Sequence, residues 1–185
     1  MTSTVTYTID AAHSSAGFKV RHMMISNVHG EFSRLSGTVH FNPADPAASS
    51  VEVTIPVASL TTRDEQRDAH LKSADFFDAE KYPEIQFRSR QVTPNGDGEW
   101  KVTGDLTVHG VTKQVTLDVE GPTPEATDPW GGVRSGVAVT AKINRKDFGL
   151  VWNVGLETGG VLVGEEVHIQ IEAELIRQAV VQNAA

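Results

Sequence analysis

The stretch VRSGVAVTAKI, residues 133–143, shows the pattern that decides the fold. Apolar residues recur there at every second position, as Val137, Val139, Ala141 and Ile143, and Ser135 is the one polar step in that phase. Successive side chains of a strand point to opposite faces, so a period of two predicts a strand with one dry face and one wet face.

The same alternation recurs along most of the chain, at residues 5–9, 16–22, 28–41, 51–57, 85–87, 100–108, 111–119 and 167–175. The dry phase changes between Phe32 and Leu35, which predicts a bulge or a sharp bend inside the run 28–41. The segment PNGDG, residues 94–98, predicts a hairpin turn. Strands joined in sequence order by hairpins favour an antiparallel meander of about eight or nine strands.

One helical insert, near residues 63–80, interrupts the strands. Thr61 and Thr62 are the expected helix cap, and residues 63–72 contain helix formers without Gly or Pro. Arg67 and Asp68 follow each other on this helix, where they form a solvated face or anchor the helix to the barrel through an ion pair. The pair FF at 76–77 predicts that one ring seals the interior while the other packs between helix and sheet.

Composition limits the organisation and the partners of the chain. Its 185 residues suit a single domain over residues 1–178, followed by a frayed tail at 179–185. The net charge of −8 argues against binding nucleic acid, and the absence of a long apolar run argues against stable membrane insertion. The first residues show no signal peptide, so we expect a cytoplasmic protein as the chain stands, or a periplasmic or extracellular one if a leader was removed.

No catalytic or metal-binding constellation is recognisable. The seven histidines have neither His-x-His nor His-Glu-x-x-His spacing, and cysteine is absent. His13 precedes Ser14, but neighbouring residues of a strand point to opposite faces, which argues against a nucleophile and its base. We therefore expect no enzyme activity, no metal and no required cofactor.

Five motifs, in their order along the chain, resemble the YceI-like family of polyisoprenoid-binding, lipocalin-like proteins. They are HSSAGFKVRH at 13–22, RDAHLKSADFF at 67–77, KYP at 81–83, GDLTVHGVT at 104–112 and INRKDFGL at 143–150. The resemblance extends from about residue 7 to about residue 175. Long motifs that recur together in order are specific for a family.

The resemblance implies an all-β fold, an extended eight-stranded antiparallel β-barrel with the short helical insert. It also implies a long lumen that holds a polyisoprenoid, an isoprenoid quinone or a similar long-chain lipid, and often a homodimer. Many relatives are secreted to the periplasm, whereas the first residues of this chain show no signal peptide. The family brings no established catalytic machinery.

The alternating apolar residues supply a candidate wall for that lumen, because their modest size leaves volume unfilled. The expected lumen residues are Phe18, Val20, Val39, Phe41, Val53, Ile55, Phe76, Phe87, Trp100, Val102, Leu106, Leu117, Val137, Val139, Ile143, Trp152, Ile169 and Ile171. A polar head group needs hydrogen-bonding partners at a mouth or along one wall. The candidates for that role are His22, Asn144, Arg145 and Asn153.

Three functions remain open from the residues. The first is a carrier or store of a long-chain lipid. The second is an enzyme that acts on an apolar, isoprenoid-like substrate inside the barrel with one of the histidines. The third is a structural domain whose interior is filled by its own side chains.

Overall fold

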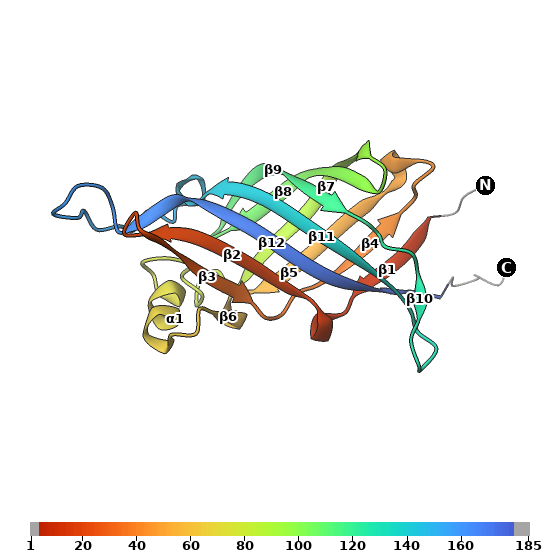
Figure 1. The fold of residues 1–185 in the computed structure, drawn as a ribbon, viewed down its shortest axis with the longest axis horizontal. Coiled ribbons are helices and arrows are strands. Elements are labelled where there is room, and N and C mark those ends of the chain that lie inside the picture. The colour runs from red at the N-terminus through yellow and green to blue at the C-terminus, as the bar shows by residue number, and fades with distance from the viewer. Residues whose placement is uncertain (1–3, 180–185) are drawn as a thin grey trace.

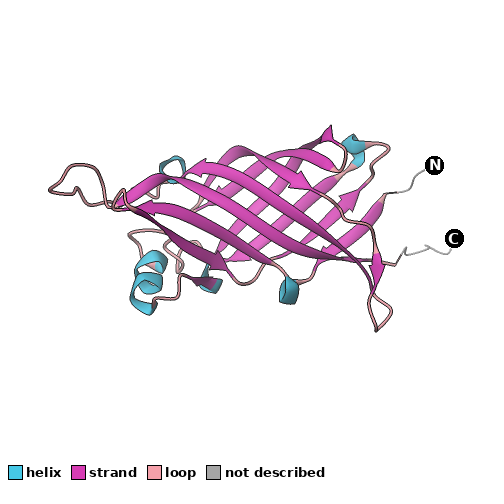
Figure 2. Cartoon of the chain, in the orientation of Figure 1, coloured by secondary structure: helices cyan, strands magenta, loops and turns pink. Residues whose placement is uncertain are grey.

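The computed structural model describes residues 4–179, which form an elongated β-barrel with one α-helix at its side (Figures 1 and 2). The strands are β1 (Val5–Ile9), β2 (Ser15–His22), β3 (Ser26–Phe32), β4 (Ser36–Phe41), β5 (Ser50–Pro56), β6 (Leu60–Thr61), β7 (Glu84–Gly96), β8 (Glu99–Val108), β9 (Val111–Glu120), β10 (Ala126–Thr127), β11 (Val133–Asn144) and β12 (Val163–Arg177). The helix is α1 (Glu65–Lys72), and the short 3-10 turns are η1 (Ala11–His13), η2 (Pro46–Ala48), η3 (Val57–Ser59) and η4 (Arg145–Phe148).

Eight strands close the barrel in the order β1, β4, β5, β7, β8, β9, β11 and β12. Every neighbouring pair in this ring is antiparallel, and β12 closes it by pairing with β11 on one side and β1 on the other. The predicted eight-stranded antiparallel barrel with a short helical insert is therefore confirmed. A barrel of about eight strands has an interior that side chains fill or that holds one small ligand.

The long strand β12 changes its neighbour along its length. Residues 175–177 pair with β1, whereas residues 163–172 pair with β2. The sheet continues from β2 to β3 and to the short β6, and α1 lies beside these strands (Figure 1). This half of the barrel is called the α1 end below, and the half where β1 begins and β12 ends is called the terminal end.

The run 28–41 is two strands rather than one. The chain bends at residues 33–35, and Phe32 and Leu35 on either side of the bend are both buried. Strand β3 pairs with β2 and β6, while β4 pairs with β1 and β5. The change of phase seen in the sequence therefore marks the point where the chain leaves one set of neighbours for another.

Two further boundaries differ from the predicted ones. Strand β7 extends to Gly96 and places Pro94 opposite Trp100, so the hairpin turn is reduced to Asp97 and Gly98. Strand β12 begins at Val163 rather than 167, because Val163 pairs with His22 across a register shift. The tail predicted to fray, 179–185, lies outside the described residues except for its first position.

The helix is capped by Asp64 rather than by Thr61 or Thr62, and it is anchored by Arg67 and Asp68 through hydrogen bonds to Thr62 rather than through an ion pair. Asp64 is the N-cap, and its carboxylate accepts the backbone N–H of Arg67. Both Arg67 and Asp68 bond to Thr62: the guanidinium donates to the threonine hydroxyl and carbonyl oxygens, and the Asp68 carboxylate accepts the threonine N–H and O–H. Thr62 is buried, so this hydrogen-bonded group fastens α1 to the end of β6.

The core occupies the interior of the barrel. Its most deeply buried side chains are Leu35, Val57, Phe148 and Leu175, which come from four separate segments. Among residues 4–179, no helix is both long enough and apolar enough to cross a membrane.

Candidate ligand-binding cavity

An apolar cavity of about 260 Å³ lies inside the barrel. Side chains from the ring strands, from β2 and β3, and from the α1 insert all contribute to its wall. An engineered apolar cavity of about 150 Å³ stays dry and binds benzene. The cavity therefore has room for hydrocarbon, and the protein's own side chains do not fill the interior completely.

The cavity is long relative to its volume. Along β12 its wall runs from Val163 to Leu175, and at a rise of about 3.3 Å per residue these twelve steps correspond to about 40 Å of strand. Val163 lies at the α1 end, and Leu175 lies at the terminal end beside Ile9. A narrow space of this shape suits a linear chain better than a compact molecule.

Most of the residues predicted for the lumen do line the cavity. They are Phe18, Val20, Val39, Val53, Ile55, Phe76, Phe87, Val102, Leu106, Leu117, Val137, Val139, Ile143, Ile169 and Ile171. They point inward because they share the dry phase of their strands, except Phe76, which lies in the insert. Their contact with a ligand stays a prediction.

Three predicted lumen residues lie outside the wall of the cavity. Phe41 and Trp100 pack edge to face against each other with ring centroids 5.2 Å apart, and the Trp100 indole N–H donates to the Gly121 carbonyl. Trp152 packs against Phe76 and the ring of His70. Each tryptophan thus packs against aromatic side chains and lies outside the wall of the cavity. Alternation along a strand does not predict such contacts.

The aromatic pair of the insert differs from the prediction as well. Phe76 and Phe77 both line the cavity. Phe77 also packs edge to face on Phe32, with centroids 5.7 Å apart. The two adjacent rings reach one space because residues 74–77 form a turn beyond α1 rather than a continuation of the helix.

Sequence reasoning missed further lining residues, most of them at strand ends or outside strands. They are Ile9, Ala16, Gly17, Phe32, Leu35, Val51, Leu71, Phe77, Ile85, Val108, Val119, Phe148, Leu150, Val163, Val167, Ala173 and Leu175. Strand alternation was the available signal for Ala16, Val51, Val167, Ala173 and Leu175. For Leu71, Phe148 and Leu150 no period of two exists, because they lie on a helix or an irregular segment.

The position of the Phe18 ring depends on a glycine on the neighbouring strand. Gly30 lies opposite Phe18 on the neighbouring strand, and a Cβ added at Gly30 would lie 2.3 Å from Cζ of the Phe18 ring. Atoms cannot approach that closely, so any larger residue at position 30 would displace the ring. The glycine thus lets the Phe18 ring lie over β3.

Three of the four head-group candidates lie outside the wall of the cavity. The Asn144 side chain accepts the Lys146 N–H at the start of η4, and the residue is exposed. The Asn153 amide bonds to the backbone of Val163 at both its nitrogen and its oxygen. His22 is absent from the wall and pairs with Val163 at the end of β2. The two asparagines shape the loop, and their polar atoms are already engaged.

Arg145, the fourth candidate, does line the cavity and is only 4% exposed. Its Nε donates to the Gly164 carbonyl at 2.8 Å, and Nη1 donates to the carbonyls of Leu150 and Trp152 at 2.6 and 3.0 Å. Nη2 donates to the Val163 carbonyl at 3.3 Å. Burial lowers the pKa of this guanidinium below its ordinary value, although arginine still remains charged.

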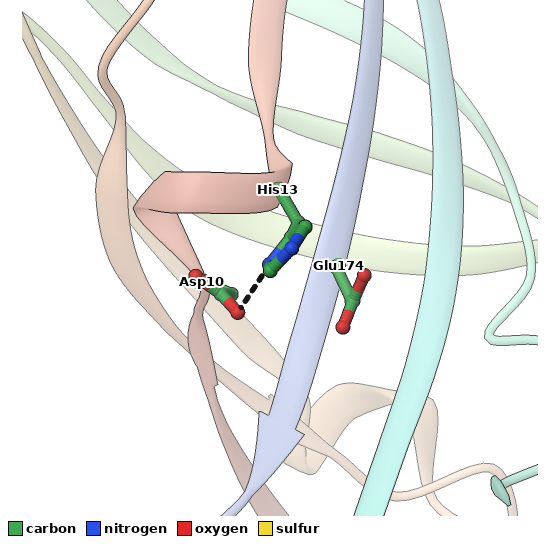
Figure 3. Close-up of side chains that lie close together, drawn as sticks. All are labelled: Asp10, His13 and Glu174. Carbon is green, nitrogen blue, oxygen red and sulfur yellow. Dashed lines mark hydrogen bonds and ion pairs between the residues drawn. The ribbon is translucent and has the colours of Figure 1, made fainter. Parts of the chain in front are cut away.

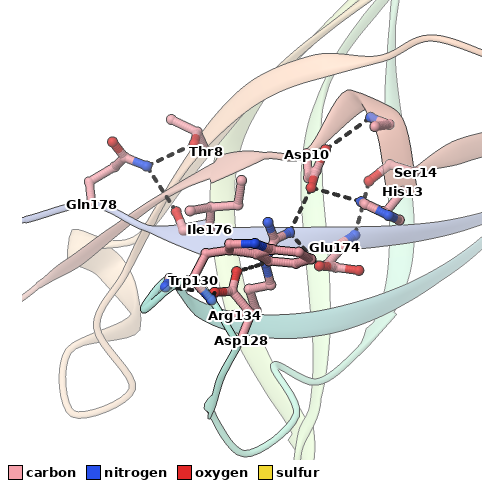
Figure 4. Close-up of polar contacts among 12 residues, drawn as sticks. Thr8, Asp10, His13, Ser14, Asp128, Trp130, Arg134, Glu174, Ile176 and Gln178 are labelled. Carbon is pink, nitrogen blue, oxygen red and sulfur yellow. Dashed lines mark hydrogen bonds and ion pairs between the residues drawn. The ribbon is translucent and has the colours of Figure 1, made fainter.

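The terminal end carries a different polar cluster (Figure 4). Arg134 donates to three carboxylates, those of Asp10, Asp128 and Glu174, at 2.6, 2.6 and 2.5 Å. Hydrogen bonds from Arg134 hold the pKa values of the Asp10 and Asp128 carboxyls well below their usual range. Nearby, the Tyr7 hydroxyl donates to Glu125, and burial together with this bond raises the pKa of Tyr7 to about 12.

Asp10, His13 and Glu174 in this cluster bring one potential metal ligand each within 4.8 Å of one another (Figure 3). Arg134 already bonds to the two carboxylates, and His13 bonds to Asp10 at 2.9 Å. Side chains of the protein itself therefore offset part of the negative charge of these carboxylates. This arrangement is an ion-pair network that joins η1, β11 and β12.

The α1 end also exposes large apolar side chains on two neighbouring loops. Met23, Met24 and Ile25 form the turn between β2 and β3, while Val151 and Val154 belong to the connection between β11 and β12. The two loops are joined by a hydrogen bond from the Met23 N–H to the Leu162 carbonyl at 2.8 Å. Both project beyond the strands at the same end of the barrel (Figure 1).

The fold and its interior define a class first: a closed antiparallel barrel built around an elongated apolar cavity. The chain matches the YceI-like domain over residues 7–175, and it therefore belongs to the YceI-like domain family. The expected family is thus confirmed.

Two curated relatives are UPF0312 proteins. A UPF0312 protein from Vibrio cholerae is 44% identical over 146 residues, which cover 78% of this chain and 77% of the relative. A UPF0312 protein from Staphylococcus aureus is 39% identical over 168 residues, which cover 91% and 95%.

Solved structures share the fold. BcnA from Burkholderia cenocepacia superposes with a TM-score of 0.73 at 29% identity and covers 90% of this chain and 98% of its own. The Campylobacter jejuni YCEI protein superposes with a TM-score of 0.70 at 32% identity, covering 86% and 90%. A polyisoprenoid binding domain from Saccharophagus degradans has a TM-score of 0.66 at 16% identity, covering 93% and 98%, and shows the likeness of fold alone.

Proposed function

We propose that the protein binds a long-chain isoprenoid lipid, such as a polyisoprenoid or an isoprenoid quinone, in the barrel cavity and carries or stores it. The observation that supports this proposal is the unfilled interior of about 260 Å³. Within residues 4–179, its wall consists of apolar residues, one glycine and one charged residue. Such a wall offers hydrocarbon the dry surroundings it prefers to water.

The energetics suit this ligand class. Burial of hydrocarbon is worth about 0.8 kcal/mol per methylene, so about ten buried units supply roughly 8 kcal/mol, which corresponds to micromolar affinity. No polar contact is needed along the chain for binding of this strength. A carrier needs an affinity of this kind because its cargo is nearly insoluble in water.

The comparisons support the choice of an isoprenoid. A structural neighbour with the same fold is described as a polyisoprenoid binding domain, and the YceI-like family includes this chain. The elongated wall along β12 suits a linear chain. The competing enzyme hypothesis draws no support from the wall, since none of the seven histidines, all within the described residues, lines the cavity.

Filling the cavity tests the proposal. Val139 lines it and Thr140, its neighbour on β11, is exposed on the outer face. We expect Val139→Trp to reduce the lipid retained by the protein at least tenfold, because the indole occupies the ligand's space. Thr140→Trp adds the same group outside and should leave retention unchanged.

The measurement is native mass spectrometry of protein purified without detergent, followed by lipid extraction. Equal retention by Val139→Trp and the parent chain, with both proteins folded, would remove the cavity as the binding site. A parent chain that neither retains lipid nor takes up added isoprenoid would favour a structural domain. The same spectra report whether the protein is a homodimer.

A further inference from the structure

We infer that Arg145 makes the cavity selective for lipids with an anionic oxygen head group, and that it holds this head at the α1 end of the barrel. The inference rests on the proposed function and adds to it the class of head group and the direction in which the ligand lies. Carboxylate and phosphate heads share the required chemistry.

The first observation is the position of the charge. Arg145 follows β11 directly as the first residue of η4, and its side chain is 4% exposed. Among residues 4–179 it is the one charged residue in a wall of more than thirty residues. A ligand inside the cavity therefore meets a single strong electrostatic feature.

The second observation is that this charge has no anionic partner within hydrogen-bonding distance among the described residues. Its printed bonds go to four backbone carbonyls, those of Leu150, Trp152, Val163 and Gly164. Carbonyl dipoles solvate a cation but do not neutralise it. A buried cation whose charge is not neutralised attracts an anion more strongly than the same cation in water would.

The carboxylate of Glu165, which acts electrostatically on Arg145, is already engaged. Glu165 forms an ion pair with Lys146 at 2.5 Å and hydrogen-bonds Asn144 rather than Arg145. Its electrostatic effect raises the pKa of Arg145, but burial outweighs that effect and the pKa is lowered overall. Glu165 is thus an electrostatic neighbour of Arg145 but not its hydrogen-bonding partner.

One donor of Arg145 remains for a ligand. A guanidinium carries five N–H groups, and four hydrogen bonds account for four of them. The fifth belongs to Nη2, which donates once, to Val163 at 3.3 Å. A hydrogen bond to a charged partner is worth about 1.5–3 kcal/mol, or about 10- to 100-fold in affinity.

The orientation of the ligand follows from the cavity's shape. Arg145 lies at the α1 end, near Phe148 and Leu150, whereas the wall at the terminal end is formed by residues such as Ile9 and Leu175. A head bound at Arg145 sends the hydrocarbon tail toward Leu175. The protein's net charge of −8 opposes an anion there, so the nearby charge of Arg145 has to outweigh it.

A series of ligands with one chain length tests this on the parent protein. Calorimetric titration below the micellar range would compare hexadecanoate, hexadecyl phosphate, hexadecanol and hexadecyltrimethylammonium. We expect at least one of the two anions to bind at least tenfold more tightly than the alcohol and the cation to bind weakest. Comparison of the carboxylate with the phosphate then identifies which head the site prefers.

The outcomes separate this inference from the proposed function. Equal affinities across the series would overturn the role of Arg145 and leave lipid binding intact. Failure of every chain to bind would sink the proposed function itself.

A variant and a matched control sharpen the result. Arg145→Gln removes the charge and keeps an N–H donor, so the preference for anions should disappear while the alcohol still binds. Lys142→Met removes an exposed cation of β11 that pairs with Glu166, and the preference should persist. If Arg145→Gln does not fold by circular dichroism, the ligand series on the parent chain decides alone.

A crystal soaked with 16-bromohexadecanoate tests the direction. The anomalous signal of bromine should lie near Leu175, at the far end from Arg145. A bromine peak beside Arg145 would contradict the assigned orientation.

Discussion

Two arginines at opposite ends of the barrel have different hydrogen-bonding partners. Arg134, at the terminal end, bonds to three carboxylates, and its charge is more than balanced by the protein. Arg145, at the α1 end, bonds to four backbone carbonyls and no carboxylate. The comparison teaches that the arginine at the terminal end is paired with carboxylates of the protein. The arginine at the α1 end is instead buried beside the cavity without a carboxylate bonded to it among residues 4–179.

The two ends also differ in their polar contacts and in their exposed apolar side chains. The terminal end is tied together by Tyr7, Glu125 and Arg177 in addition to the Arg134 network. The α1 end carries the exposed apolar loops around Met24 and Val151, whereas the terminal end exposes the side chain of Trp130. The terminal end is thus joined by the ion pairs of Arg134, and the proposed head-group site lies at the α1 end.

The largest expected effect is that of Arg145→Gln on folding. The shorter amide cannot reach four carbonyls, so several buried acceptors lose a charged donor, at a cost of about 3 kcal/mol. Urea unfolding followed by circular dichroism measures this loss. A change below about 1 kcal/mol would show that the carbonyls find other donors, and Arg145 would then not anchor the loop.

Arg134→Gln should cost less than Arg145→Gln, because the residues of its network are partly exposed to solvent. Its effect should also depend on pH. The pKa values of Asp10 and Asp128 are lowered by Arg134 in the folded state, so the stability they contribute is present above their unfolded pKa of about 3.9 and is lost as pH falls below it.

The parent chain should therefore lose stability steeply below about pH 4, and Arg134→Gln should show a shallower loss. Arg88→Gln removes an exposed pair with Glu52 and serves as the control, with an expected cost below about 1 kcal/mol. Parallel acid slopes for the parent and Arg134→Gln would contradict the network's role at the terminal end.

The smallest expected effect is that of Ile25→Ser at the α1 end. Ile25 is 73% exposed, so its replacement should change the free energy of unfolding by less than about 0.5 kcal/mol. Thermal unfolding at one pH is sufficient to measure it. A loss above about 1 kcal/mol would mean that the loop contributes to folding, and the division between the two ends would need revision.

The sequence predicted the strands and most of the wall because both depend on a local period of two, and the resemblance to the family implied the closed barrel. Val139 and Ile169 could be assigned to the interior without knowing which strands they pair with. The same rule failed for Phe41 and Trp100, whose mutual contact brings together residues on β4 and β8. It also offered no means to see Phe148, which lies on a 3-10 turn.

The head-group candidates show the same limit. His22, Asn144, Arg145 and Asn153 were equivalent in the sequence as polar residues near strand ends. The structure engages Asn144 and Asn153 with the loop backbone and brings only Arg145 of the four to the cavity. The three partners of Arg134 were not foreseen, because Asp10, Asp128 and Glu174 are distant from one another along the chain.

By itself, the sequence determined which face of each strand is dry, and hence that the strands enclose an apolar interior. Alternation is a property of adjacent residues, so it can be read without tertiary contacts. Only the tertiary structure decided that this interior keeps a cavity and that one cation faces it. Both depend on how side chains from separate strands pack against one another. Packing between residues that are distant along the chain produces no periodic pattern in the sequence.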